Sequence, residues 1–323
     1  MVFFGSGPFA LPALEVLHRR SPRHPLLHAV TRPDRPAGRG RNPQPTEVRR
    51  RAADLGVECD APDSANDPAY LDRLEGLGAD IFIVADYGEM LRKRLRGTPR
   101  IGTFNLHASL LPAYRGAAPV VHALLAGEDV TGVTLFRVEK GLDTGPIVGC
   151  ARTEIAPLET AGELEARLAR LGAELLDASL DAFDAGTSRE TPQDERLATR
   201  APKLDKKAGA IDWGMAPGAL TDFVRALNPW PGAFSFMAAR GGALERTVFL
   251  RVKPGASPGE TFPPGAVAGV RKDGFSVRAG DGAVEVLELQ REGKAPLSAA
   301  AYLRGRQLRP GDVFTSGPGP DPR

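Results

Sequence analysis

Three polar residues on two short segments of the sequence have side chains suited to catalysis. Asn105 and His107 lie two positions apart at the end of an apolar stretch, 101–106, whose composition predicts a buried strand. In an extended chain, side chains two positions apart point to the same side. Asp143 lies in a glycine-rich turn, 139–146, that follows another expected strand. An amide, an imidazole and a carboxylate could therefore meet at one site, because α/β proteins bind ligands in the loops at strand ends.

Acyl transfer without a protein nucleophile is the chemistry that these groups support. A hydrolytic metal site would need three or four suitably spaced ligands, and a serine hydrolase would need a Gly-x-Ser-x-Gly turn, which the sequence lacks. In acyl transfer a substrate amine attacks a carbonyl carbon. Asn105 would donate to the oxyanion, and His107, oriented by Asp143, would be a second donor or carry protons. Composition alone leaves an alternative open, in which Asn105 caps a loop and Asp143 only closes a turn.

The elements around these residues predict an α/β fold with a mostly parallel sheet. A first strand, 2–4, leads through a glycine-containing loop into a helix, and helices alternate with further expected strands at 26–30, 81–85, 101–106, 133–138 and 147–155. Gly5 and Gly7 are similar to part of a dinucleotide-binding turn. The third glycine of that turn is missing and no acidic residue ends the strand 26–30, so no nicotinamide cofactor is expected.

A change of architecture is expected in the second half of the chain. Residues 1–186 form the expected catalytic domain, and residues 187–205 have the composition of a linker. Five short strands are expected within 206–314, with hairpin signals at Asp273-Gly274 and Asp281-Gly282. This pattern predicts a small β-barrel, an architecture often used to bind nucleic acid. Residues 315–323 are expected to form a disordered tail.

Length and composition are those of a globular protein. The chain has 323 residues, of which 42% are hydrophobic and 25% charged, enough for two domains. Its two cysteines, Cys59 and Cys150, lie far apart and match neither a disulfide framework nor a zinc site, so a reducing cytoplasm is expected. No apolar run approaches the ~20 residues of a membrane span, so no membrane partner is expected.

Positive charge gathers in two regions, although the net charge is only +2. The segment 31–51 has seven arginines against two acidic residues, and the chain from Lys206 onward has 16 lysines and arginines against 11 acidic residues. The first region begins with a proline-interrupted stretch, 31–45, that is long for a loop in a compact domain and is therefore expected to be functional. Together they predict a polyanionic partner, while solvated surface arginine is the alternative that charge leaves open.

Several motifs carry a resemblance to a known family. They are Asn105-Leu-His-Ala-Ser-Leu-Leu-Pro112, Gly141-Leu-Asp-Thr-Gly145, the run from Pro33 to Gly40, Ile211-Asp-Trp213 and Asn228-Pro-Trp-Pro231. In these motifs, and along the chain from about Phe3 to Val313, the sequence resembles the 10-formyltetrahydrofolate-dependent formyltransferases. The resemblance implies a Rossmann-like formyltransferase domain followed by an OB-like β-barrel.

The resemblance also implies a reaction and its residues. The formyl group of 10-formyltetrahydrofolate would pass to the α-amino group of methionine on initiator tRNA, without a metal or a nicotinamide cofactor. Asn105, His107 and Asp143 match the catalytic residues of the family. The implied folate-binding residues are Tyr87, Gly88, Ser109, Leu110, Leu111, Pro112, Val138 and Gly141. The implied tRNA-binding residues are Arg35, Arg39, Arg41, Lys206 and Lys207. A cytoplasmic monomer is expected.

One segment departs from the family pattern. Where the family reads Ala-Tyr-Gly followed by an apolar pair and proline, this chain has Asp86-Tyr-Gly-Glu89-Met-Leu-Arg92, so the folate contacts near Asp86 and Glu89 stay open. Two other functions remain as alternatives. One is a formyltransferase of the same fold that acts on a sugar-nucleotide amine or a purine precursor, and the other is a tRNA-binding relative without activity. The arginine-rich segment favours tRNA as substrate, and the intact catalytic residues favour an enzyme.

Overall fold

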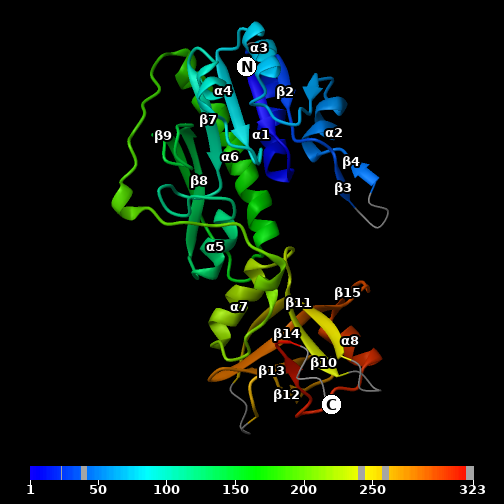
Figure 1. The fold of residues 1–323 in the computed structure, drawn as a ribbon. Coiled ribbons are helices and arrows are strands. Elements are labelled where there is room, and N and C mark those ends of the chain that lie inside the picture. Colours follow the sequence, from blue (N-terminus) through cyan, green and yellow to red (C-terminus); the bar gives the residue numbers. More distant parts are fainter. Residues whose placement is uncertain (23, 38–41, 239–243, 257–261, 318–323) are drawn as a thin grey trace. The chain divides into compact units, whose positions relative to one another are not determined.

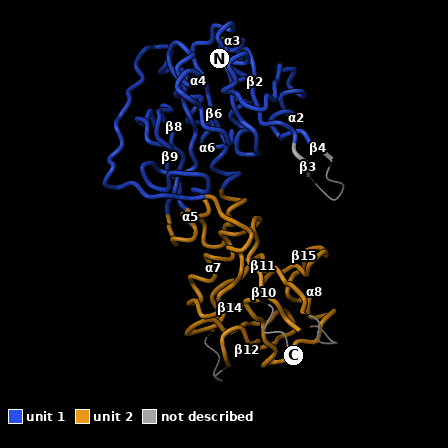
Figure 2. Tube along the Cα trace, in the orientation of Figure 1, with its two compact units in different colours: residues 1–119, 130–154, 165–202 blue, residues 120–129, 155–164, 203–323 orange. Residues whose placement is uncertain are grey.

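The structure of the chain is a computed structural model, which describes residues 1–22, 24–37, 42–238, 244–256 and 262–317 (Figure 1). Contacts within the chain divide it into two compact units (Figure 2). Unit 1 consists of residues 1–119, 130–154 and 165–202, and unit 2 consists of residues 120–129, 155–164 and 203–323. The segment expected as a linker therefore belongs to unit 1 as far as residue 202.

A seven-stranded sheet forms the centre of unit 1, and its first five strands are parallel as the α/β pattern predicts. In spatial order the strands are β5 (Cys59–Asp60), β2 (His28–Val30), β1 (Val2–Gly5), β6 (Ile81–Ala85), β7 (Gly102–His107), β8 (Val130–Arg137) and β9 (Ile147–Glu154). The last two strands are antiparallel. All five residues of β6 are apolar and buried, which suits a strand covered on both faces.

Helices connect and cover these strands. They are α1 (Leu11–Arg20), α2 (Glu47–Asp54), α3 (Pro68–Gly76), α4 (Lys93–Gly97) and the long α6 (Ala161–Asp184). Side-chain oxygens cap two of them: the hydroxyl of Thr46 accepts from the N–H of Arg49 in α2, and the carboxylate of Asp67 caps α3. The helix α6 begins with a reciprocal capping box, because Thr160 and Glu163 each accept from the other's backbone N–H.

The arginine-rich segment is a two-stranded ribbon and not an irregular loop. The strands β3 (Arg35–Ala37) and β4 (Asn42–Gln44) pair antiparallel, with Pro36 opposite Pro43 (Figure 1). Prolines are compatible with this pairing at positions where no ladder hydrogen bond is needed. Their presence explains why the sequence predicted a loop. Residues 38–41, which include Arg39 and Arg41, lie outside the described residues.

Unit 2 contains a curled antiparallel sheet in which consecutive strands pair as hairpins, as the turn signals predict. Its strands follow the order β12 (Val267–Val270), β13 (Phe275–Ala279), β14 (Gly282–Arg291), β11 (Leu244–Gly255), β10 (Ala233–Ala238) and β16 (Phe314–Thr315), and β15 (Pro296–Ser298) also pairs with β14. A bridge between Ala266 and Val313 brings the two ends of this order together, so the sheet approaches a closed barrel as expected for an OB-like fold. The described part of unit 2 also contains α7 (Pro217–Ala226), α8 (Ala299–Gly305) and α5 (Pro119–Leu125) except for its first residue.

Aromatic packing forms the core of unit 2. The ring of Trp213 lies edge-on to Phe249, with 5.3 Å between centroids, and its indole N–H donates to the hydroxyl of Ser235 at 3.0 Å. Phe275 and Phe314 are also fully buried. Each such ring contributes about 1.5–3 kcal/mol by leaving water. Among the described helices, none combines the length and apolar character that crossing a bilayer requires.

Candidate active site

The strand β7 places Asn105 and His107 on the same face of the sheet, as the spacing predicts. His107 is the last residue of β7 and is 6% exposed, whereas Asn105 is half-buried. Neighbouring strands fix both positions, because Asn105 lies opposite Val84 of β6 and Phe136 of β8. Within the described part of the chain the carboxamide of Asn105 has no hydrogen-bond partner. A half-buried amide at a strand end is therefore available to a ligand.

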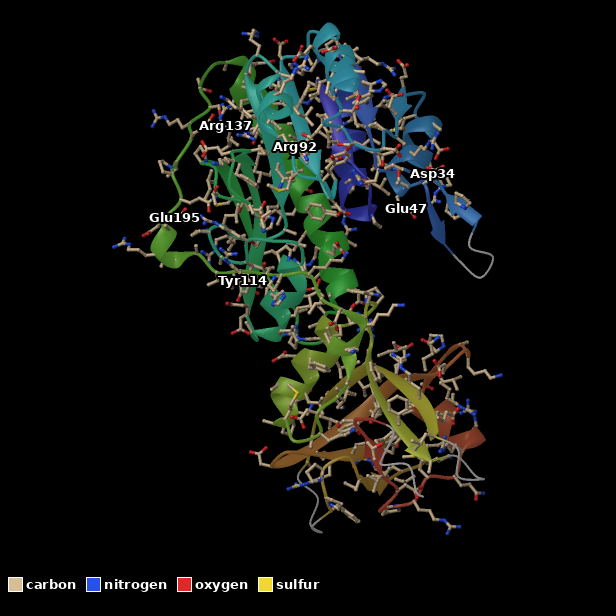
Figure 3. The ribbon with its side chains drawn as sticks, viewed as in Figure 1. Asp34, Glu47, Arg92, Tyr114, Arg137 and Glu195 are labelled. Carbon is tan, nitrogen blue, oxygen red and sulfur yellow. The ribbon has the colours of Figure 1, made fainter. Side chains whose placement is uncertain are left out.

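The ring of His107 has an acceptor on one side and a carboxylate on the other. Its Nε2 lies 2.9 Å from the carbonyl oxygen of Tyr114 (labelled in Figure 3), and since a carbonyl can only accept, Nε2 carries the hydrogen. Its Nδ1 lies 3.8 Å from the carboxylate of Asp143. Burial lowers the pKa of His107, although Asp143 and the Tyr114 carbonyl both act to raise it. The neutral ring thus keeps a lone pair on Nδ1, facing Asp143.

Asp143 reaches His107 by a route that the sequence did not predict. Because β8 is antiparallel to β7, its last residue, Arg137, lies beside the middle of β7 and away from His107. The turn 138–146 must therefore fold back to bring the Asp143 carboxylate close. Asp143 has a left-handed backbone with φ 55°, and its carboxylate accepts from the N–H of Gly116 at 2.8 Å. Gly145 allows the close approach, because a Cβ there would lie 1.8 Å from the carbonyl oxygen of Arg137.

The three groups together form an arrangement suited to acyl transfer. A free amide donor lies two positions before a neutral imidazole on the same strand, and the carboxylate 3.8 Å from that imidazole would stabilise it once it gained a proton. Among the described residues, no cluster of three or more His, Cys, Asp or Glu side chains could hold a metal ion.

The residues implied in folate binding differ in what they can offer. Ser109 is fully buried, and its hydroxyl donates to the carbonyl of Ala113 at 2.6 Å, so it fixes the loop after β7. Leu110 and Pro112 are half-buried, and Leu111 is 7% exposed. The loop is also tied to β8, because the hydroxyl of Thr134 accepts from the N–H of Leu111 and donates to the carbonyl of Ser109.

Tyr87 packs into the core. Its ring lies edge-on to Phe4 at 5.4 Å and is 2% exposed, so only its backbone and that of exposed Gly88 are left for a ligand. On the other side, Val138 is half-buried and Gly141 is exposed.

Asp86 and Glu89, the two acidic departures from the family pattern, have different surroundings. Asp86 has φ 46°, and its carboxylate accepts from the N–H of Gly7. Desolvation of this carboxylate outweighs that hydrogen bond and raises the pKa of Asp86 to about 6. Glu89 points to the base of the ribbon, where it forms an ion pair with Arg32 at 2.6 Å and accepts from Ser64 and other donors. Asp86 thus follows β6 beside the turn after β1, and Glu89 is a structural anchor.

Some of the residues implied in tRNA binding lie outside the residues that the structure describes. The backbone of Arg35 belongs to β3, and Arg39 and Arg41 lie in the undescribed segment 38–41. In unit 2, Lys206 and Lys207 are exposed on a short 3-10 helix, Lys206–Gly209, that is capped by Asp205. Within the described residues neither lysine has an ion-pair partner.

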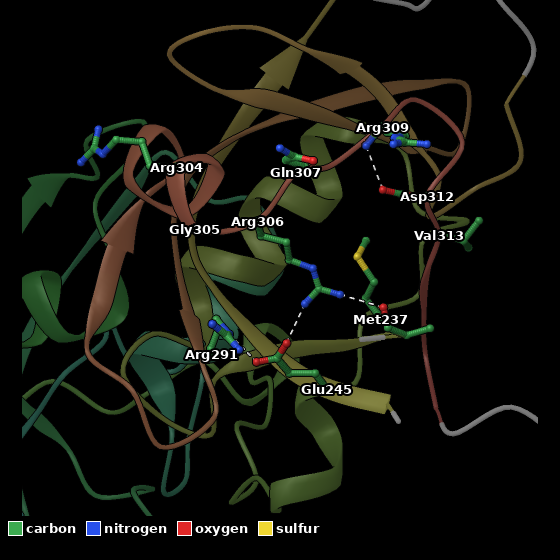
Figure 4. A pocket seen from close by; sticks show the side chains of 11 residues that line it. Met237, Glu245, Arg291, Arg304, Gly305, Arg306, Gln307, Arg309, Asp312 and Val313 are labelled. Atoms are coloured by element: carbon green, nitrogen blue, oxygen red, sulfur yellow. Dashed lines mark hydrogen bonds and ion pairs between the residues drawn. The ribbon is translucent and has the colours of Figure 1, made fainter. Parts of the chain in front are cut away.

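A basic cavity of about 710 Å³ lies within unit 2 (Figure 4). Glu245 pairs there with Arg291 and Arg306. The guanidinium groups of Arg304 and Arg309 have no partner among the described residues. The cavity therefore carries surplus positive charge.

Sequence reasoning missed three residues that lie close to the catalytic trio. The hydroxyl of Thr199 accepts from the N–H of Tyr114, and the amide of Gln193 donates to the carbonyl of Asp143. The guanidinium of Arg115 donates to the same Gln193 side chain. Two of them fall in the segment read as a linker, where no apolar period marks a packed element. No sequence signal marked Arg115 either, because its burial becomes visible only in the structure.

Known proteins match this chain along nearly its whole length. A family described as "Formyl transferase" matches residues 1–180, and one described as "Formyl transferase, C-terminal domain" matches residues 203–307. The chain is 42% identical over 311 residues to a protein of Parafrankia sp. (strain EAN1pec) named methionyl-tRNA formyltransferase, covering 96% of this chain and 97% of that protein. A protein of the same name from Parvibaculum lavamentivorans is 41% identical, covering 97% and 98%.

Solved structures show the same fold at lower identity. WlaRD, a sugar 3N-formyltransferase crystallised with dTDP and 5-N-formyl-THF, has a TM-score of 0.63 at 15% identity and covers 91% of this chain and 98% of its own. HypX from Aquifex aeolicus, in complex with tetrahydrofolic acid, has a TM-score of 0.60 at 17% identity and covers 97% of this chain and 50% of its own.

Proposed function

The chain belongs to the formyl transferase family, and from this premise we propose that it is an enzyme that formylates methionyl-tRNA. It transfers the formyl group of 10-formyltetrahydrofolate to the α-amino group of methionine on initiator tRNA. The observation that carries this function is the identity of about 40% with proteins named methionyl-tRNA formyltransferase, over nearly the full length of both chains.

We propose that Asn105, His107 and Asp143 catalyse the transfer. The lone pair of the methionine amine forms a bond to the formyl carbon, and the C=O π electrons move to oxygen, where the free carboxamide of Asn105 would donate to the oxyanion. When the intermediate collapses, the bond from carbon to N10 of the folate breaks and N10 takes up a proton.

Proton movement falls to His107 and Asp143. Nδ1 of His107 is the ring nitrogen that can gain a proton without losing the hydrogen bond to Tyr114. Asp143, 3.8 Å away, stabilises the resulting imidazolium. The proton released by the attacking amine would therefore pass through this pair to the leaving nitrogen.

We propose that the folate lies against the loops after β6, β7 and β8, and that the tRNA contacts the ribbon. The folate residues are Tyr87 and Gly88 through their backbone, the run Ser109–Pro112, and Val138 and Gly141. Arg35 of the ribbon, Arg39 and Arg41 of the arginine-rich segment, and Lys206 and Lys207 of unit 2 would bind RNA phosphates. The surplus charge of the unit 2 cavity supports residues 206–314 as a tRNA-binding domain.

We also propose that the enzyme is cytoplasmic and monomeric. Sedimentation of the purified protein tests the monomeric state.

One assay tests the function directly. Purified protein is incubated with 10-formyltetrahydrofolate and, in parallel, with methionyl-initiator tRNA, methionyl-elongator tRNA and an amino-sugar nucleotide. We expect rapid formylation of the initiator alone. Formylation of the sugar nucleotide, or of neither tRNA, would refute the proposal.

A further inference from the structure

The segment 191–201, which we call the strap, is a packed part of unit 1. It begins with a two-way backbone bridge, in which Thr191 and Ile147 exchange hydrogen bonds of 2.8 Å, and it ends where the N–H of Ala201 donates to the carbonyl of Arg115 at 2.7 Å. Between these points it has only one short 3-10 helix, Glu195–Leu197. Its contacts are therefore made by individual side chains and carbonyls, which can be examined one by one.

Gln193 of the strap uses every hydrogen-bonding position of its amide. Its Nε2 donates to the carbonyl of Asp143 at 2.8 Å and to that of Gly145 at 2.7 Å. Its Oε1 accepts from Nε of Arg115 at 3.1 Å and from Nη2 at 2.7 Å. Arg115 is 9% exposed and pairs in turn with Glu195 at 2.7 Å. One side chain thus joins the turn that carries Asp143 to a buried arginine.

The geometry of Asp143 requires such a support. A non-glycine residue with positive φ is unfavourable and persists where its surroundings fix it. Gln193 contacts the backbone of Asp143 and of Gly145 two positions later, so the backbone is restrained on both sides of Thr144. The side-chain carboxylate is left to face Gly116 and His107.

The strap also supports the other partner of His107. The hydroxyl of Thr199 accepts from the N–H of Tyr114 at 2.8 Å, and the carbonyl of Thr199 accepts from the N–H of Arg115 at 2.9 Å. Tyr114 has φ 61°, and its carbonyl is the group that accepts from His107. Both groups that face the His107 ring are therefore attached to the same short segment.

We propose that Gln193 is a positioning residue for formyl transfer, because it sets the distance between Asp143 and His107. Thr199 is a second positioning residue, which sets the distance between the Tyr114 carbonyl and His107. The proposal rests on the proposed function, in which the two ring partners of His107 govern its proton. Neither Gln193 nor Thr199 needs to touch a substrate. Their loss should therefore reduce the rate of the chemical step and leave substrate binding nearly unchanged.

The experiment compares Gln193→Met, Gln193→Glu and Thr199→Val with the wild-type enzyme. Gln193→Glu keeps the acceptor for Arg115 but removes both donors to the turn, whereas Gln193→Met removes all four hydrogen bonds. Gln290→Met is the matched control, because Gln290 also donates from a glutamine amide to a backbone carbonyl, that of Lys294, on a hairpin of unit 2. We expect kcat to fall on the order of 100-fold in Gln193→Met, as for misplaced catalytic groups generally. The KM values for tRNA and folate should stay close to wild type.

A second readout does not depend on substrates. NMR titration of the His107 ring should give a lower pKa in Gln193→Met than in the wild type, because a displaced Asp143 no longer raises it. Among charged groups, Asp143 faces the ring directly, while Arg115 and Glu195 stand behind the turn. Wild-type kcat in Gln193→Met, or an unchanged His107 titration, would overturn the proposal. If Gln193→Met does not fold, Gln193→Glu and Thr199→Val are judged by the fall in kcat.

The outcomes separate this inference from the proposed function. If the wild-type enzyme fails to formylate methionyl-tRNA, the function is wrong, yet the His107 titration still tests whether Gln193 positions Asp143. If the wild-type enzyme is active and the strap variants match it, the function stands and the inference fails.

Discussion

The ion pair between Arg32 and Glu89 predicts a large and pH-dependent stability effect. Glu89 accepts hydrogen bonds from Arg32 at 2.6 Å, Ser64 at 2.5 Å, the N–H of Ala65 at 3.2 Å and Asn66 at 2.9 Å. Replacement by glutamine keeps the shape, removes the charge and turns an amide donor toward other donors. Removing one member of a buried pair destabilises by about 3–5 kcal/mol, and a hydrogen bond to a charged group contributes about 1.5–3 kcal/mol.

Partial exposure moves the expected effect to the lower end of that range. The side chains of Arg32 and Glu89 are 21% and 17% exposed, so we expect Glu89→Gln to destabilise unit 1 by about 2 kcal/mol, within the range for a hydrogen bond to a charged group and below that for a fully buried pair. Glu75→Gln is the matched control, because it makes the same charge change in an exposed pair with Arg94. Exposed pairs are weak, so the control should unfold like the wild type.

The stabilising effect of Glu89 should depend on pH in a defined direction. Burial acts to raise the pKa of Glu89, but the hydrogen bonds from Ser64, Asn66 and Ala65 and the charge of Arg32 outweigh it, and the pKa lies below its usual 4.5. A lowered carboxyl pKa stabilises the folded state above the unfolded pKa, and this contribution is lost as pH falls through the folded pKa. The difference between Glu89→Gln and wild type should therefore be full at pH 7 and smaller at pH 3.

The assay must report on unit 1 itself. Both tryptophans, Trp213 and Trp230, belong to unit 2, so intrinsic fluorescence would follow the other unit. Hydrogen exchange of peptides from β1 and β6, measured across a urea series, reports the free energy of opening where Glu89 is anchored. Equal stability of Glu89→Gln and Glu75→Gln, or a difference that does not change between pH 7 and pH 3, would refute the reasoning.

Three further predictions concern the site and its surroundings. Asn105→Ala should reduce kcat on the order of 100-fold or more in the formylation assay, and a rate near wild type would exclude Asn105 as the oxyanion donor. Arg39→Ala should raise KM for charged tRNA, leave KM for folate unchanged and lower the salt slope of tRNA binding by about 1; an altered folate KM alone would refute the ribbon assignment. Asp86→Asn should raise the melting temperature at pH 8 but not at pH 4, because a carboxyl whose pKa is raised from 3.8 to about 6 stabilises the folded state less once it is ionised. A calorimetric scan at both pH values checks this, and no gain at pH 8 would contradict it.

The parts of the fold that the sequence predicted well are those where periodic burial determines structure. The run before His107 predicted β7, and the alternation within it placed Asn105 and His107 on one face. In the same way, Asp273-Gly274 and Asp281-Gly282 located the turns that flank β13. These features are determined by residues that are close together in the sequence, so they can be recognised from the sequence alone.

Other parts depend on contacts that the sequence does not display. The ribbon was read as a loop because Pro36 and Pro43 interrupt any strand pattern, yet their backbones are register partners in an antiparallel pair. The fold-back of Asp143 follows from the antiparallel direction of β8, which strand periodicity leaves undetermined. Gln193 was read as part of a linker because a residue that bonds to backbone carbonyls leaves no periodic signature.

The strap has a consequence for the order in which the molecule matures. During synthesis the chain emerges from its N-terminus, so all seven strands of the unit 1 sheet and the three polar residues of the trio precede Gln193 and Thr199. A nascent chain that ends before residue 191 contains the whole sheet but not the segment that holds the partners of His107. If the sheet forms first, the proposed site would gain its full geometry only after the strap has docked.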